Sequence, residues 1–140
     1  MLSILMPVFN ERERVEQAIS EVLDTELPTD FELVIVDDGS TDGTREILRG
    51  GDWGERVRLL EHEVNQGKGA AVQTALREAR GEFSCIFDAD LEYDSADLAL
   101  LLPALLDGRA NACFGVRAFD GYTSHSFLFV LGNKGVTLAC

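Results

Sequence analysis

Short apolar runs alternate with amphipathic segments along most of the chain. The apolar runs predict buried strands at residues 2–6, 31–36, 57–60, 83–87 and 110–116. Apolar residues at helical spacing predict helices at residues 13–23, 70–79 and 96–106, with a shorter helix that ends near Leu48. Strands separated by helices are typical of βαβ units. We therefore expect an α/β fold with a mostly parallel sheet flanked by helices, similar to a Rossmann fold.

Single residues mark where several of these segments begin or end. Pro7 is expected to end the first strand. Gly81 and Gly108 are expected to end the helices before them, and Ser95 to cap the helix that follows it. The last segment, residues 126–140, is apolar with a helix-like pattern and stops without a cap or a polar terminus. We therefore expect a helix there, in a domain that is truncated at its C-terminus.

Polar residues follow four of the predicted strands. They are Asn10-Glu11, Asp37-Asp38, Asp88-Ala89-Asp90 and Arg117. Ligands of α/β sheets bind at the carboxyl ends of the strands. Because the carboxyl ends of parallel strands meet at one edge of the sheet, we expect these clusters to converge on a single site.

The acidic segment after the fourth strand, Asp88-Ala89-Asp90-Leu91-Glu92, is the strongest chemical signal. If the strand continues in an extended conformation, its three carboxylates point the same way. Carboxylates packed so closely repel one another, and a divalent cation removes that conflict. Mg²⁺ or Mn²⁺ takes oxygen ligands and keeps positions free for substrate phosphates, so Asp88, Asp90 and Glu92 are candidate ligands of a metal that assists a diphosphate leaving group. The alternative is a solvated acidic loop.

Two further segments contain candidate contacts to a nucleotide. Asp38, at the end of a strand, could accept a hydrogen bond from a base or a ribose hydroxyl, or could belong to an ordinary turn. Phe9 could pack beside a base. Glu11 could bind a sugar or base group, or only favour the N-terminus of the next helix. Each of these signals is ambiguous on its own.

Four basic or titratable positions complete the candidates. Residues 65–70, Asn-Gln-Gly-Lys-Gly-Ala, place Lys68 at a glycine-rich helix start, as in an anion site. The segment lacks the glycine and the Ser or Thr of a P-loop, and a flexible helix start with an exposed lysine is the alternative. Arg117 could clamp a phosphate or lie on the surface. We interpret His62 as structural and His125 as a candidate phosphate contact.

Composition narrows the possible partners. The chain has 140 residues, enough for one domain, and a formal net charge of −13, which disfavours binding to nucleic acid. A phosphorylated small molecule can still bind where a cation screens that charge. Three cysteines without metal-ligand spacing are typical of free thiols in a reducing compartment. With no secretory signal and no apolar run of membrane-spanning length in the sequence, we expect a cytoplasmic protein.

Four motifs in this order resemble the inverting glycosyltransferases of family 2, which have the GT-A fold. The resemblance covers nearly the whole chain, and the motifs that carry it are Met6–Glu11, Val34–Asp42, Asn65–Gly69 and Phe87–Glu92. Within the family, Asp-Ala-Asp-Leu is similar to dolichol-phosphate mannose synthases and bacterial polyprenyl-phosphate glycosyltransferases, as is the segment Leu131–Leu138. The resemblance implies that residues 1–140 are the N-terminal, donor-binding part of such a domain.

The resemblance also implies roles for individual residues. Asp88 and Asp90, with Glu92, would hold the metal, and Arg117 would contact a phosphate of the donor or of the acceptor. Ala89 would lie against the donor, and Lys68 is a further candidate contact to it. The residues implied to line the nucleotide pocket are Pro7, Phe9, Glu11, Val36 and Asp38.

The implied reaction is a direct displacement with inversion. A phosphate oxygen of a polyprenyl lipid attacks the anomeric carbon of a UDP- or GDP-linked sugar, and the metal-bound nucleoside diphosphate leaves. Because a phosphate monoester is already anionic near neutral pH, a strong general base is not required. Such an acceptor would bring the longer protein to the cytoplasmic face of a membrane.

Three other functions are consistent with parts of the sequence. A truncated or non-catalytic module would bind the nucleotide sugar without turnover. A phosphohydrolase would use the Asp-x-Asp motif as a nucleophile, but Glu92 stands where Thr or Val is expected and the motif follows the fourth strand instead of the first. A sugar nucleotidyltransferase would need a glycine-rich basic loop after the first strand, where this chain has Asn10-Glu11-Arg12-Glu13.

Overall fold

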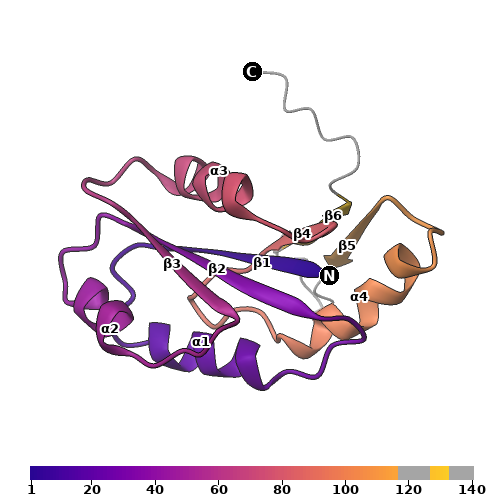
Figure 1. The fold of residues 1–140 in the computed structure, drawn as a ribbon, viewed down its shortest axis with the longest axis horizontal. Coiled ribbons are helices and arrows are strands. Elements are labelled where there is room, and N and C mark those ends of the chain that lie inside the picture. Colours follow the sequence, from indigo (N-terminus) through magenta and orange to yellow (C-terminus); the bar gives the residue numbers. More distant parts are fainter. Residues whose placement is uncertain (117–126, 133–140) are drawn as a thin grey trace, which may run out of the picture.

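The computed structural model of the chain describes residues 1–116 and 127–132, with side chains described for residues 1–113. A six-stranded sheet lies between two layers of helices, with α3 on one face and α1, α2 and α4 on the other (Figure 1). In chain order the elements are β1 (Leu2–Val8), α1 (Val15–Asp24), β2 (Phe31–Asp38), α2 (Thr44–Gly50), β3 (Val57–His62), α3 (Lys68–Glu78), β4 (Phe83–Ile86), α4 (Ala96–Leu106), β5 (Ala112–Val116) and β6 (Phe127–Gly132).

The strand order is β3-β2-β1-β4-β6-β5, and the first four strands in this order are parallel. β6 pairs antiparallel with both β4 and β5. The predicted α/β fold with a mostly parallel sheet is therefore confirmed, with two antiparallel pairings at one side of the sheet. None of the helices in residues 1–116 is long and apolar enough to cross a membrane.

Successive residues of β1 pack against opposite helical layers, as the two-residue period of a strand requires. Ile4 and Met6 belong to the larger apolar core, which they share with Ile19 of α1 and Leu98 of α4. Leu5 faces the other way, into a smaller core that contains two alanines of α3, Ala71 and Ala75. Small side chains on α3 allow this helix to lie close to the sheet, which brings its N-terminus to the carboxyl ends of the strands.

Pro7 does not end β1, contrary to the prediction, because the strand continues to Val8. β4 pairs with β1 only from Leu2 to Leu5. The carbonyl of Leu5 accepts the N–H of Phe87 at 2.9 Å, so the backbone polar groups of Leu5 face β4. The backbone nitrogen and carbonyl of Pro7, two residues further on, face the same side of β1, but β4 has already ended there. The missing N–H of proline therefore removes no hydrogen bond of the ladder there.

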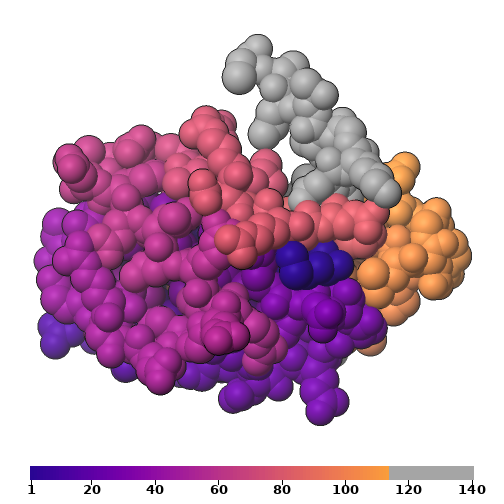
Figure 2. Space-filling view, viewed as in Figure 1, coloured from indigo at the N-terminus to yellow at the C-terminus, as the bar shows by residue number. Residues whose placement is uncertain are grey.

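Gly81 does not cap α3, which ends at Glu78 with Ala79 at the cap position. A Cβ atom on Gly81 would lie 2.7 Å from the backbone nitrogen of Ser3, so the glycine is needed for close approach to β1. The same end of the sheet is seen in Figure 2, where the indigo amino terminus lies beside salmon-coloured residues near the start of β4. Gly108 does follow α4 in the left-handed conformation (φ 70°), as predicted.

The predicted helix over residues 126–140 is wrong for its first part, because residues 127–132 form β6. The backbone of this segment finds partners in β4 and β5 on its two sides, and this long-range pairing outweighs the helix-like pattern. Residues 133–140 lie outside the described part of the chain.

Ser95 precedes α4 as predicted but makes no side-chain cap, since its hydroxyl donates to the carbonyl of Glu21 instead (3.1 Å).

Candidate active site

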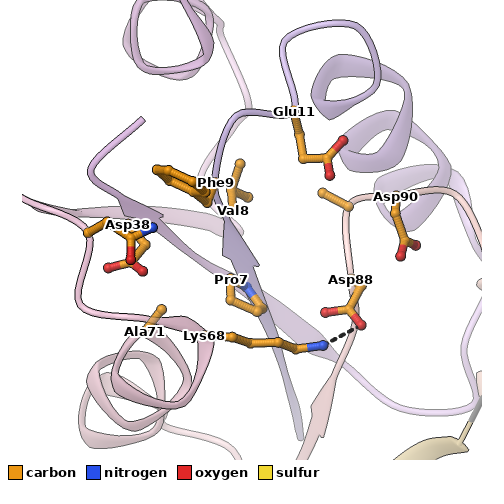
Figure 3. Close-up of a pocket in the computed structure, with 11 residues that line it drawn as sticks. Pro7, Val8, Phe9, Glu11, Asp38, Lys68, Ala71, Asp88 and Asp90 are labelled. Atoms are coloured by element: carbon orange, nitrogen blue, oxygen red, sulfur yellow. Dashed lines mark hydrogen bonds and ion pairs between the residues drawn. The ribbon is translucent and has the colours of Figure 1, made fainter. Parts of the chain in front are cut away.

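A pocket of about 270 Å³ lies at the carboxyl ends of the parallel strands (Figure 3). It opens between the end of β1 and the segment that follows β4, where the two strands no longer pair. The residues that line it are Pro7, Val8, Phe9, Glu11, Asp38, Asn65, Lys68, Ala71, Asp88, Ala89 and Asp90. The predicted convergence of the polar clusters that follow the first, second and fourth strands is therefore confirmed.

The loop after β1 is held in place by the loop after β2. Asn10 has a left-handed backbone (φ 54°), and its N–H donates to Oγ of Ser40 at 3.0 Å. In return, the side-chain oxygen of Asn10 accepts the N–H of Thr41 at 2.9 Å. Asparagine tolerates this conformation better than most residues. The two loops thus fix Phe9 and Glu11, the neighbours of Asn10, at the edge of the pocket.

Asp38 ends β2 and is only 2% exposed. One of its carboxylate oxygens accepts the N–H of Gln66 at 2.9 Å and is 2.6 Å from Nδ1 of His62. The other accepts the N–H of Gly67 at 2.8 Å. Burial by itself raises the pKa of Asp38, but the hydrogen bonds from Gln66, His62 and Gly67 outweigh it and lower the pKa below its ordinary value. Asp38 is therefore ionised at neutral pH and fastens the loop before α3.

His62 is buried beside Asp38, which agrees with its interpretation as structural. Because an ionised carboxylate can only accept hydrogen bonds, Nδ1 of His62 must carry the proton. Nε2 lies 2.9 Å from the hydroxyl of Thr74 on α3. His62 thus links the end of β3 to both Asp38 and α3. The sequence did not identify Asp38 as its partner, although the two residues pair in the parallel register of β2 and β3.

Lys68 is the first residue of α3, and its ammonium nitrogen lies 2.6 Å from Oδ2 of Asp88. Figure 3 shows the lysine side chain extended across the pocket towards this carboxylate. The lysine side chain is 60% exposed and that of Asp88 is 20% exposed. The structure therefore brings the predicted anion contact and the first predicted metal ligand into one ion pair at the pocket mouth.

The expected row of three carboxylates does not form. After Phe87 the chain turns instead of continuing as a strand, and Leu91 has a left-handed backbone (φ 62°). Asp90 accepts the N–H of Glu92 at 3.0 Å, which closes a local turn. Asp88 and Asp90 line the pocket, whereas Glu92 is exposed to solvent and does not. In the described part of the chain, no three His, Cys, Asp or Glu side chains are close enough together to hold a metal ion.

The two carboxylates that remain still suit a hard divalent cation. Asp88 and Asp90 offer oxygen donors only. Mg²⁺ is commonly bound by one or two carboxylates, with waters and substrate phosphates completing its coordination. Tyr93, which the sequence did not single out, packs against the larger apolar core with its ring 6.0 Å from that of Phe87. Its pKa is raised by burial and then by the negative charge of Asp88, consistent with an acidic environment.

Val36 does not line the pocket. It is fully buried in the small core between the sheet and α3, beside Leu5 and Ala71. Val8, Asn65 and Ala71 do line the pocket and were not singled out from the sequence. Ala71 is on the buried face of α3, so its helical spacing from Ala75 was the available signal. Arg117 and His125 lie outside the described residues.

Comparison with known proteins places these features in a family. Residues 3–129 match the family described as Glycosyl transferase family 2. The dodecaprenyl-phosphate galacturonate synthase of Rhizobium johnstonii is 35% identical over 108 residues, which are 74% of this chain and 32% of that protein. The dolichol-phosphate mannosyltransferase of Pyrococcus furiosus is 29% identical over 120 residues, which are 86% of this chain and 34% of that protein. The chain therefore spans about a third of the length of these curated relatives.

The fold is shared with solved structures of the same kind. The mannosyltransferase PcManGT from Pyrobaculum calidifontis, solved in complex with GDP-Man and Mn²⁺, superposes with a TM-score of 0.80 at 28% identity. The match covers 95% of this chain and 44% of that one. The predicted GT-A fold and the resemblance to polyprenyl-phosphate enzymes are thus confirmed. From its motifs, its pocket and these matches, the chain belongs to glycosyl transferase family 2.

Proposed function

We propose that this chain is the donor-binding part of an inverting glycosyltransferase that moves a sugar from a nucleoside diphosphate sugar to a polyprenyl phosphate. The observation that carries the proposal is the pocket itself. It joins an aromatic side chain and a buried carboxylate to a lysine and three further carboxylates, at the strand ends where α/β folds bind ligands.

The pocket has two chemically different sides. In Figure 3, Asp38 and Ala71 lie on one side, Asp88 and Asp90 on the other, and Pro7 between them. Phe9 lines the pocket and is 44% exposed, which leaves its ring free to pack against a nucleobase. We place the base on the side of Asp38 and the diphosphate on the side of Asp88.

Asp88 and Asp90 would hold Mg²⁺ or Mn²⁺ on the diphosphate side. When bound, the metal would neutralise the negative charge that develops on the departing nucleoside diphosphate. The complex of PcManGT with GDP-Man and Mn²⁺ supports this choice of cofactor. Lys68, at the N-terminus of α3, is placed to contact the same phosphates, because helix N-termini favour anions.

The acceptor is proposed from the relatives. Two of them are named for dodecaprenyl phosphate and dolichol phosphate. One oxygen of such a phosphate would attack the anomeric carbon as the bond to the nucleoside diphosphate breaks, with the electron pair leaving on the diphosphate. The attacking oxygen is already anionic, so no strong base is required from the chain. A lipid acceptor would place the reaction at the cytoplasmic face of a membrane.

Calorimetry tests the donor site directly. UDP and GDP are titrated, with and without Mn²⁺, into the chain and into Asp90→Asn. Asp107→Asn, which removes the same charge from an exposed side chain at the C-terminal end of α4, is the control. We expect one nucleotide to bind only with Mn²⁺, and Asp90→Asn to weaken that binding at least about tenfold, since even outer-shell partners of metal sites are worth this much.

Three outcomes separate the possible functions. Binding that depends on both Mn²⁺ and Asp90, followed by sugar transfer to a polyprenyl phosphate in the longer protein, supports the proposal. Binding without transfer in the longer protein favours a non-catalytic module. If the folded chain binds neither nucleotide, the proposed donor site is refuted.

A further inference from the structure

We infer that Lys68 is a built-in counter-ion that takes the place of the divalent cation beside Asp88, so that the metal must displace this lysine before it can bind. The lysine then becomes available to the diphosphate. This inference rests on the proposed function and adds to it a coupling between metal and nucleotide that passes through one side chain.

The charge of the pocket requires a counter-ion. Four of the described lining residues are carboxylates, namely Glu11, Asp38, Asp88 and Asp90, and Lys68 is the only cation among them. Asp38 already has partners in the loop before α3 and in His62. Lys68 therefore offsets the carboxylate that faces the pocket mouth, as its 2.6 Å contact with Asp88 shows.

The backbone of Lys68 is fixed while its side chain is not. Gly67, directly before it, donates its N–H to Asp38 at 2.8 Å, and the carbonyl of Gly67 accepts the N–H of Ala71 at 3.1 Å. These bonds anchor the start of α3 to the end of β2. The lysine stem, 60% exposed, is the movable part. Rotation about its bonds can carry the ammonium from Asp88 to a phosphate without moving the helix.

The strength of the ion pair suits displacement. Pairs as exposed as this one are weak, since solvent screens them and two side chains must be held in place. A divalent cation carries twice the charge of the ammonium group and can replace it on Asp88. Lys68 should therefore reduce the affinity for metal alone and increase the affinity for nucleotide once metal is present. Two ligands coupled in this way must affect each other equally.

The test measures metal binding without any nucleotide or activity. Mn²⁺ is titrated into the chain, Lys68→Met and Lys68→Arg, and free Mn²⁺ is followed by its electron paramagnetic resonance signal. Methionine keeps the length of the side chain and removes the charge, whereas arginine keeps the charge. Arg77→Met changes the net charge equally at the last turn of the same helix and is the control.

We expect Lys68→Met to bind Mn²⁺ up to about fivefold more tightly than the parent, the fold-change that corresponds to the upper end of the range for exposed ion pairs. Lys68→Arg and Arg77→Met should stay close to the parent. At saturating Mn²⁺, Lys68→Met should bind UDP or GDP more weakly. If Lys68→Met binds Mn²⁺ no more tightly than the parent, the inference is overturned. If Lys68→Met gains Mn²⁺ affinity but the parent binds neither nucleotide, the counter-ion role stands and the proposed function fails.

Discussion

Asp38 offers the most quantitative test of how the site is built. Its carboxylate accepts hydrogen bonds from Gln66, Gly67 and His62. Replacing it with asparagine preserves the size of the side chain but exchanges one acceptor oxygen for an NH₂ donor. If the remaining oxygen keeps Gln66 and His62, the new amide faces the N–H of Gly67, and two donors oppose each other.

The magnitude follows from the three bonds. Hydrogen bonds to a charged group contribute about 1.5–3 kcal/mol, and those between neutral groups contribute about 0.5–1.5 kcal/mol. One charged bond is lost and two become neutral, so Asp38→Asn should lower the free energy of unfolding by about 4–5 kcal/mol. Domains are stable by only about 5–15 kcal/mol, so the loss is easily measured. Urea unfolding followed by fluorescence of Trp53, the single tryptophan, measures it.

The control for this prediction is Asp107→Asn, an exposed carboxylate whose change should stay within about 0.5 kcal/mol of the parent. Amide hydrogen exchange adds a local measurement, since Gln66 and Gly67 should exchange faster in Asp38→Asn. An unfolding free energy for Asp38→Asn within about 0.5 kcal/mol of the parent would refute the view that Asp38 fastens the loop before α3.

Two other predictions concern pH and packing. The pKa values of Asp38 and Asp42 are lowered from 3.8 by hydrogen bonds that outweigh burial, so their stabilisation is present above 3.8 and lost as pH falls through the lowered values. Urea midpoints should therefore decrease below about pH 4, and a constant midpoint down to about pH 2.5 would contradict this. Gly81→Ala would place a Cβ atom 2.7 Å from the backbone nitrogen of Ser3 and should lower the free energy of unfolding in urea by about 1–3 kcal/mol. Gly69→Ala is the control, because the space around Gly69 is open, and it should not lower this free energy. Equal effects of the two substitutions would contradict the close approach at Gly81.

The positions of most pocket residues could be predicted because they depend on a general property of parallel sheets. Glu11, Asp38 and Asp88 all follow or end strands that the apolar runs reveal, Pro7 lies one residue before the end of β1, and such strand ends meet at one edge. Val36 shows where this reasoning stops. It lies two residues before Asp38, and α3 covers it, which only the packing of the helix on the sheet decides.

Backbone conformation accounts for the main error at the acidic motif. Leucine rarely adopts a left-handed conformation, and nothing in the sequence indicates that Leu91 does. Its left-handed backbone follows the turn at Ala89 and Asp90, and Glu92 is left facing solvent instead of the pocket. The pairing of β6 was missed for a related reason, since its partners are distant in sequence and its own pattern favours a helix as much as a strand.

The proline in β1 has a consequence for the shape of the pocket that goes beyond local geometry. A growing sheet gains a backbone hydrogen bond for each residue by which two strands extend their pairing. At Pro7 that gain is smaller, because one of the required N–H groups is absent. Continued pairing of β1 with the segment after Ile86 is therefore less favourable. That segment leaves the sheet and forms the wall of the pocket that carries Asp88 and Asp90. The absence of the amide hydrogen that proline lacks thus helps to keep β1 and the segment after β4 from pairing across the pocket.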